Sequence, residues 1–256
     1  MSNKYGKNFF YCGKNDEAKV RLFCFPYAGG GASIYARWKG YFDNDFLQVM
    51  PVQLPGRESR HKEVDYENSI IAMAKEAAEA INEYGDTFFA LFGHSMGGIF
   101  VYEVAKELVN KYNNPPKALF ISGTPAPSLV SKNIDLTNGL SEELFQQLLR
   151  RYNGMDPKML ENSDFYECYV PVIKRDFIAV GEYRVKEKQK LNIPLSILYG
   201  IEDKDMTQAA VESWREYVTM KPSVEVMEGG HFYIREKAAQ VCQYIENKLK
   251  NIIEEK

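Results

Sequence analysis

Short apolar runs alternate with amphipathic stretches along most of the chain, and this alternation limits the fold more than any other feature. Six runs have the length and composition of buried strands: VRLFCF (20–25), LQVMPVQL (47–54), TFFALFG (87–93), KALFISG (117–123), LSILYG (195–200) and SVEVME (223–228). Amphipathic stretches repeat apolar residues at three- and four-residue spacing over 69–84, 98–112, 207–218 and 235–250. Strands that alternate with helices predict an α/β protein, in which a mostly parallel central sheet carries helices on both faces.

The alternation is interrupted between about residues 128 and 191, where no strand is predicted. Two stretches of this segment, SEELFQQLLRRYN and DFYECYVPVIKRDFIAVGEYRV, have helical character. A segment of that length between two core strands predicts a helical lid over the carboxyl edge of the sheet rather than a second domain. We therefore expect residues 1–256 to form a single domain with a lid insertion at about 128–191.

The composition argues against several classes of function. With 45% hydrophobic and 26% charged residues, the chain can bury a full core. Its net charge of -3 offers no basic surface for nucleic acid, and no run is suited to a signal peptide or a membrane span. We therefore expect a cytoplasmic protein that binds neither nucleic acid nor membrane. The four cysteines lack C-x-x-C spacing, which predicts reduced thiols rather than a zinc site or disulfides: Cys12, Cys24, Cys168 and Cys242.

Ser95 stands between two glycines in GHSMG (93–97), a match to G-x-S-x-G that follows a predicted strand and precedes a predicted helix. In this context the motif presents a nucleophilic serine at the mouth of a sheet. The flanking glycines are required there, because a β-carbon at either position would clash with the adjoining helix and strand. The alternative is a serine that merely caps an ordinary helix. The strand, turn and helix context favours the nucleophile.

A serine hydroxyl needs a general base near neutral pH, and the chain contains three histidines. His94 adjoins Ser95 on a sharp turn, where neighbouring side chains diverge, so we expect it to pack rather than react. His61 lies in the charged loop PGRESRHKE and is expected to be solvated. His231, in EGGHFY, directly follows the last predicted strand on the edge where the serine also emerges. Its place last in the order serine, acid, histidine makes His231 the predicted base.

The acid that orients the histidine should come from a loop on the same edge, between the serine and the histidine. The strand LSILYG is followed by IEDKDMT, which supplies Glu202, Asp203 and Asp205. We select Asp203, because its G-x-x-D spacing from Gly200 sets it just past the strand end, and keep Asp205 in reserve. The preceding strand, in LFISGTPAPSL, has no carboxylate at its tip.

Two backbone amides should stabilise the oxyanion that forms on the substrate. The amide of Met96 follows the serine at a helix N-terminus and can point at that charge. The loop CFPYAGGGAS, after the first strand, supplies a second donor, which by position is Ala28 with Tyr27 as the alternative. A nucleotide-binding loop is the weaker interpretation, because AGGGAS completes neither G-x-G-x-x-G nor G-K-[ST].

Stretches along nearly the whole chain resemble one known family. FCFPYAGGGAS, VMPVQLPGRESR, LFGHSMGG, LFISGTPAP, PVIKRDF with EYR, LYGIEDKD and EVMEGGHFYI are similar, in order and spacing, to the type II thioesterases that accompany nonribosomal peptide and polyketide synthetases. PGRESR and SGTPAP are more specific than the serine motif, since most α/β-hydrolases lack them. Gly31 and Gly98 depart from the family pattern, in which we expect serine and alanine.

The resemblance implies an α/β-hydrolase fold with a helical lid, and the hydrolysis of stalled or misprimed acyl groups from the phosphopantetheine arm of carrier domains. Ser95 would attack the thioester, His231 would take its proton, and Asp203 would orient the histidine. The partners implied are acyl or peptidyl carrier domains of a synthetase. No metal or diffusible cofactor is needed, because the phosphopantetheine belongs to the carrier. We expect the enzyme to be a monomer.

The lid should decide which acyl groups enter. Most of its apolar residues are spaced for packing, with a few expected to line an acyl channel: Leu144, Phe145, Leu148, Leu149, Phe165, Tyr169 and Phe177. Its basic residues are about matched by carboxylates, so the segment as a whole offers no basic surface: Arg150, Arg151, Lys174 and Arg175 among them.

Two other classes of function compete with the thioesterase. A small-molecule carboxylesterase or lipase would use the same triad, and only the family-specific stretch PGRESR argues against it. A hydrolase-like binding protein without activity would not need three triad candidates in the correct order.

Overall fold

The computed structural model describes residues 9–10, 15, 17–85, 88–130, 134, 136–152 and 163–254, without the side chains of residues 163–165 and 168. Parts of several predictions lie outside these described residues. They are the start of the third predicted strand at Thr87, the thiols of Cys12 and Cys168, the Phe165 side chain and pieces of the predicted lid. Cys24 and Cys242 are buried free thiols.

Within the described residues, one parallel sheet of six strands lies at the centre of the molecule, in the order β2-β1-β3-β4-β5-β6. The strands are β1 (Val20–Phe25), β2 (Leu47–Pro51), β3 (Phe89–His94), β4 (Leu119–Ser122), β5 (Leu195–Gly200) and β6 (Ser223–Met227). All five pairings are parallel, so the predicted α/β class with a mostly parallel sheet is confirmed.

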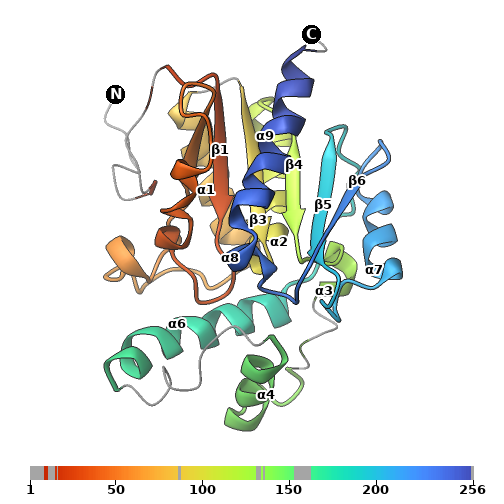
Figure 1. The fold of residues 1–256 in the computed structure, drawn as a ribbon. Helices are drawn as coiled ribbons and strands as arrows, with labels where there is room; N and C mark the ends of the chain where they lie inside the picture. Colours follow the sequence, from red (N-terminus) through yellow and green to blue (C-terminus); the bar gives the residue numbers. More distant parts are fainter. Residues whose placement is uncertain are drawn as a thin grey trace.

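Helices cover both faces of the sheet (Figure 1), because successive side chains of each strand point to opposite faces. Phe23 and Phe25 of β1 belong to the core beneath α1 (Ile70–Tyr84) and α2 (Met96–Tyr112). Leu22 and Cys24 belong to the core beneath α9 (Ala238–Glu254). The central strands are therefore buried on both sides, which explains their nearly continuous apolar sequence.

Two boundaries differ from the sequence prediction for local reasons. The predicted helix 207–218 is divided into α7 (Gln208–Glu212) and the 3-10 helix η5 (Ser213–Glu216). At the division, the Ser213 hydroxyl donates to the Ala210 carbonyl over 2.6 Å, and the Trp214 indole donates to the Thr124 carbonyl over 2.9 Å. The predicted strand 47–54 ends at Pro51: the Val52 amide still donates to the Cys24 carbonyl of β1, but the Gln53 amide donates to the Phe9 carbonyl instead.

The remaining short helices lie in the connections. η1 (Ala32–Tyr35), η2 (Trp38–Gly40) and η3 (Glu58–Arg60) lie on either side of β2 in the sequence, and α8 (Tyr233–Glu236) precedes α9. The predicted helix 235–250 thus corresponds to the end of α8 followed by α9. No helix in the described ranges combines the length and hydropathy needed to cross a membrane.

Between β4 and β5 the structure contains α3 (Pro127–Val130), α4 (Glu142–Tyr152) and α6 (Ser163–Glu182). The last two match the stretches of predicted helical character. Figure 1 shows α4 and α6 beyond the carboxyl ends of the strands, with α6 running across that edge of the sheet. The loops that follow β1, β3, β5 and β6 open toward these helices.

Candidate active site

The strand order places two loops of different origin side by side. β1 pairs with β2 on one side and with β3 on the other, and Phe25 at the end of β1 lies in register with Gly93 of β3. After β1 the chain adds β2 on one side and then crosses over to add β3 on the other side. In a parallel sheet, such a switch leaves a crevice between the loops that follow the two neighbouring strands. The glycine-rich loop after β1 and the serine turn after β3 meet in this crevice.

Ser95 occupies a backbone conformation that few non-glycine residues adopt, with φ 56° and ψ −119°. The two glycines of its motif are required by close approach rather than by flexibility. A β-carbon on Gly93 would lie 2.0 Å from the Gly97 carbonyl oxygen, and one on Gly97 would lie 2.2 Å from the Phe25 carbonyl oxygen. The serine is therefore held in a sharp strand-to-helix turn of the kind that exposes a hydroxyl at the sheet edge.

The backbone of the serine is fixed from the neighbouring strand. Its amide donates to the Ser122 carbonyl over 2.8 Å, and the Thr124 hydroxyl donates to the Ser95 carbonyl, also over 2.8 Å. Thr124 belongs to the SGTPAP stretch, so this family-specific sequence braces the serine turn.

At Gly98 and Gly31, the two positions that depart from the family pattern, the absence of a side chain leaves room for a neighbouring polar side chain. A β-carbon on Gly98 would lie 2.2 Å from the Thr124 hydroxyl oxygen, and one on Gly31 would lie 2.2 Å from Oε1 of Glu58. Neither position could take a side chain without displacing its neighbour.

The structure brings Ser95, His231 and Asp203 together. Nε2 of His231 lies 3.0 Å from the Ser95 hydroxyl oxygen, and Nδ1 lies 2.7 Å from Oδ2 of Asp203. The side chains of the histidine and the aspartate are only 7% and 3% exposed. The carboxylate can therefore hold the ring with Nδ1 protonated and leave Nε2 free to accept the serine proton.

The loops that carry the acid and the histidine are joined by their backbones. Gly200, at the end of β5, has no room for a side chain, because a β-carbon would lie 2.4 Å from the carbonyl oxygens of both Gly229 and Gly230. The Glu202 amide donates to the Gly229 carbonyl over 3.0 Å, and the Asp203 amide turns back to the Gly200 carbonyl over 2.9 Å. These contacts fix the two loops relative to each other.

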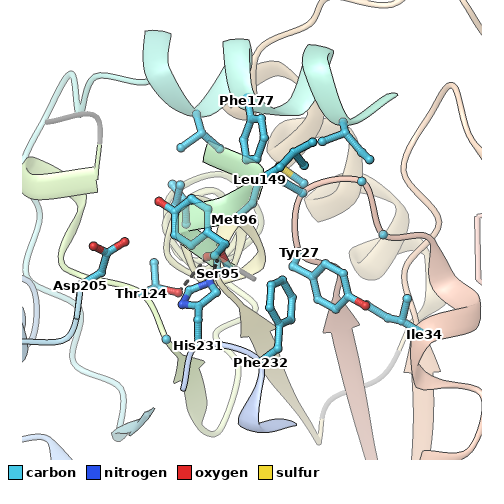
Figure 2. Close-up of a pocket in the computed structure, with 18 of the residues that line it drawn as sticks. Tyr27, Ile34, Ser95, Met96, Thr124, Leu149, Phe177, Asp205, His231 and Phe232 are labelled. Atoms are coloured by element: carbon cyan, nitrogen blue, oxygen red, sulfur yellow. Dashed lines mark hydrogen bonds between the residues drawn. The ribbon is translucent and has the colours of Figure 1, made fainter. Parts of the chain in front are cut away.

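In the described part of the chain, Asp205, the reserve acid, has no hydrogen bond to the histidine. Its carboxylate forms an ion pair with Arg151 of α4, and its backbone amide donates to Oδ1 of Asp203 over 3.1 Å. Asp205 thus lines the pocket from the side that faces α4 (Figure 2). The geometry favours Asp203 as the partner of His231.

The other two histidines have different surroundings. His94 is fully buried, and its Nδ1 lies 2.8 Å from the Ser122 hydroxyl, away from the serine that it adjoins in sequence. Burial, with a further contribution from His231, lowers the pKa of His94 well below its usual range, so the ring is neutral in the folded protein. His61 is exposed, and its Nδ1 lies 2.8 Å from the carbonyl of Glu58 within its own turn.

The predicted oxyanion donors, Ala28 and Met96, both line the pocket that contains Ser95. Across the described ranges, neither backbone amide has an acceptor within the protein. The next amide of the loop, that of Gly29, donates to Asp176 over 2.6 Å. Tyr27, the alternative donor, begins this turn, and its carbonyl accepts the Gly30 amide over 2.9 Å.

A cavity of about 480 Å³ opens above the serine, between the sheet edge and the helices α4 and α6. Figure 2 shows Phe177 and Leu149 projecting into it from the helices, opposite Ser95 and His231. Its wall toward the helices is apolar and is formed by Val130, Ile134, Leu149, Ile173, Phe177 and Val180. Of the apolar lid residues considered in the sequence, Leu149, Tyr169 and Phe177 line the cavity, whereas Phe145 and Leu148 are buried in the core.

Two contacts at the site could not be predicted from the sequence. The ring of Tyr152, from α4, lies over His231 with centroids 4.8 Å apart. Arg57, from PGRESR, pairs with Asp176 of α6 in the interior. The resemblance drew attention to PGRESR as a whole, but the partner of Arg57 is 119 residues away and no local pattern identifies it.

A strained serine turn, a histidine and an aspartate on later loops, and a parallel sheet wrapped on both faces together define an α/β-hydrolase. Comparison with known proteins narrows this class. The model of the thioesterase domain family matches residues 20–249, and the chain therefore belongs to this family. It is a hydrolase of thioesters, and the resemblance to type II thioesterases seen in the sequence is confirmed.

Three relatives illustrate the likeness. The gramicidin S biosynthesis protein GrsT of Aneurinibacillus migulanus is 33% identical over 251 residues, which cover 98% of this chain and 97% of GrsT. The medium-chain S-acyl fatty acid synthase thioesterase of Homo sapiens is 35% identical and is covered to 88% by 91% of this chain. The structure of the type II thioesterase BorB from the borrelidin biosynthetic cluster superimposes with a TM-score of 0.79 at 27% identity, over 94% of this chain and 96% of BorB.

Proposed function

We propose that this thioesterase removes stalled or misprimed acyl groups from the phosphopantetheine arms of carrier domains in nonribosomal peptide or polyketide biosynthesis. The observation that carries the proposal is the series of hydrogen bonds from Asp203 through His231 to Ser95 at the base of an apolar cavity. The biosynthetic roles in the names of GrsT and BorB support the pathway.

In the proposed mechanism, Ser95 attacks the thioester carbonyl while Nε2 of His231 takes the hydroxyl proton. Asp203 stabilises the imidazolium that forms, and the amides of Ala28 and Met96 donate to the oxyanion. The imidazolium then gives its proton to the departing thiol of the carrier arm, which leaves an acyl ester on the serine. Water activated by His231 hydrolyses this ester through a second tetrahedral intermediate and restores the free hydroxyl.

The protein needs no metal or cofactor of its own in this mechanism, because phosphopantetheine arrives on the carrier domain. We further propose that residues 1–256 act as a single monomeric domain in the cytoplasm, with the segment at about 128–191 as the lid. The apolar wall that this segment contributes to the cavity supports a role in acyl binding.

The proposal is tested by steady-state hydrolysis of one acyl group presented on a carrier domain, on free pantetheine and on a small alcohol. We expect the loaded carrier to have the highest kcat/KM, because binding energy from the remote carrier helps to position the thioester. Short acyl groups of different shape should differ among themselves by much less. Equal efficiency on the oxygen ester and the loaded carrier would instead favour a small-molecule esterase that uses the same triad.

A further inference from the structure

The PGRESR stretch enters the interior through Arg57, which no step of the proposed mechanism uses. The guanidinium forms a bidentate ion pair with Asp176 of α6, with Nη1 2.7 Å from Oδ2 and Nη2 2.8 Å from Oδ1. The two side chains are 4% and 0% exposed. Removing both charges from water costs free energy that can exceed the attraction between them. A buried ion pair is therefore weak evidence for a stabilising role, and a role in positioning the active site is the better explanation here.

The same two side chains also hold the glycine-rich loop after β1. Oδ2 of Asp176 accepts the Gly29 amide over 2.6 Å, and Nη1 of Arg57 donates to the Gly30 carbonyl over 3.1 Å. The first contact is made to the peptide that joins Ala28 to Gly29, and the second to the peptide that follows Gly30. The ion pair therefore holds the loop by hydrogen bonds at Gly29 and Gly30, the two residues that follow the predicted oxyanion donor Ala28.

The direction of the Ala28 amide follows from these contacts. The Tyr27 carbonyl and the Ala28 N–H belong to one planar trans peptide, so they point in opposite directions. The Tyr27 carbonyl accepts the Gly30 amide over 2.9 Å, which closes a tight turn. Because Asp176 and Arg57 fix Gly29 and Gly30, they also fix this turn and the direction in which the Ala28 N–H projects.

Helix α6 packs directly on the same turn. Gly29 has a positive φ of 77°, and a β-carbon there would lie 2.4 Å from Cγ1 of Ile173. Ile173 and Asp176 are three residues apart on α6 and so share one face of the helix. The loop cannot keep its hydrogen bond to Asp176 if α6 moves away.

We propose that Arg57 and Asp176 are positioning residues that hold the Ala28 amide toward the oxyanion and thereby couple the position of α6 to catalysis. Asp176 supplies the acceptor that fixes the turn. Arg57 neutralises the charge of Asp176, so that the carboxylate does not repel a developing oxyanion on the far side of the loop. This inference rests on the proposed mechanism for its oxyanion, but not on the identity of the acyl carrier.

The test measures how fast a fluorophosphonate labels Ser95, because the phosphoryl oxygen of this probe occupies the oxyanion position whatever the natural substrate is. For Asp176→Asn we expect labelling and kcat to fall by ~10- to 100-fold with little change in KM, since loss of a whole oxyanion donor costs about 10²–10³ in kcat. The melting temperature should also fall, because Arg57 stays buried without its charged partner.

A double variant separates positioning from stability. Arg57→Met combined with Asp176→Leu removes both buried charges, and such replacements are often neutral for folding. We expect its melting temperature to recover while labelling stays slow, because a leucine offers the Gly29 amide no acceptor. Arg57→Lys serves if the double variant does not fold. A lysine keeps the charge but cannot bind both carboxylate oxygens and Gly30 together, so labelling should fall by roughly three- to tenfold.

Glu103→Gln is the matched control, since Glu103 is also a buried carboxylate, paired with Lys106 at 3.1 Å and accepting the Tyr183 hydroxyl at 2.7 Å. It should lower the melting temperature without slowing labelling. Labelling at the wild-type rate in the double variant or in Arg57→Lys would overturn the inference, as would rates that simply follow melting temperature in every variant. If wild-type protein is labelled but does not hydrolyse loaded carriers, the proposed function fails and the inference stands.

Discussion

On the sheet side of the pocket, Ser95, His231 and Asp203 are joined by hydrogen bonds between nearly buried side chains. On the opposite side, α4 is held by packing of its buried Phe145 and Leu148 and by two ion pairs that reach the surface. Arg151 of α4, which pairs with Asp205, is 44% exposed. Such pairs contribute about 0–1 kcal/mol each. We call the side that carries the proposed triad the rigid wall. We expect the side formed by α4 to be the more lightly held wall, because its ion pairs are partly exposed to solvent.

Helix α6 has contacts of both kinds, partly exposed ones with α4 and a buried one with the loop after β1. It packs beside α4, where Lys174 pairs with Glu142 at 2.6 Å and the Phe145 and Phe177 rings lie 6.1 Å apart. It is also joined to the glycine-rich loop through buried Asp176. We therefore expect that, if the pocket opens, α4 moves further than the second half of α6.

The largest expected effect comes from removing the reactive groups of the rigid wall. Ser95→Ala and His231→Ala should each lower kcat by about 10⁵-fold or more, and the double variant should be no worse than either alone, because the residues act as a unit. Steady-state turnover of an acyl-loaded carrier measures this. Multiplied losses in the double variant would show that the two residues act independently and would contradict the triad.

The two aspartates of one loop sharpen the comparison, because Asp203 faces the rigid wall and Asp205 faces α4. Asp203→Asn should lower kcat by about 10⁴-fold, since an amide favours the wrong tautomer of His231. Asp205→Asn should change kcat by less than roughly tenfold, because it removes only a partly exposed ion pair. The pair serves as its own control in one kinetic assay. A reversed order of the two losses would make Asp205 the acid.

The rigid wall should also respond to pH through His94. Its lowered pKa means that the folded protein keeps this ring neutral, while the unfolded chain takes up a proton below about pH 6.5. Its contribution to stability is thus complete above that pH and declines as the pH falls, by up to about 1.4 kcal/mol per pH unit. Urea unfolding at pH 5.5 and 7.5 should show a smaller loss in His94→Gln than in wild type. Exposed His61→Gln is the control, and an equal loss in His94→Gln would refute this assignment.

The smallest effect concerns the lightly held wall. Hydrogen exchange should be fastest in α4, slower in residues 170–182 of α6 and slowest in β3. Arg151→Gln should speed exchange in α4 by at most about fivefold, the factor that corresponds to 1 kcal/mol. Lys188→Gln removes a similar exposed pair, with Glu216, and should leave α4 unchanged. Equal protection of α4 and β3 would remove the proposed difference between the walls.

The features that sequence predicts well depend on local pattern. The strands and the Ser95 turn follow from apolar periodicity and from glycines that a close-packed turn requires. The loops with Asp203 and His231 follow from the rule that parallel strands end at a common edge. The division of the predicted helix 207–218 was not predicted, because it depends on a bond from Trp214 to Thr124, 90 residues away.

In the site as well, contacts between segments that are distant in the sequence could not be predicted. The spacing from Gly200 favours Asp203 over Asp205, but the contact between Asp205 and Arg151 of α4 is not specified by any local pattern. Asp176 bonds to Gly29, 147 positions away, and to Arg57 of PGRESR, 119 positions away, so only the folded chain shows that these segments meet.

The most direct test of the account is whether an acyl group passes from a carrier to Ser95. Rapid-quench mass spectrometry after mixing the protein with an acyl-loaded carrier should detect the acyl mass on the peptide that contains Ser95, before free acid accumulates. The acyl mass should be absent from Ser95→Ala, which should leave the carrier loaded. Hydrolysis of the loaded carrier by Ser95→Ala at the wild-type rate, or an acyl group found on another residue, would contradict the account.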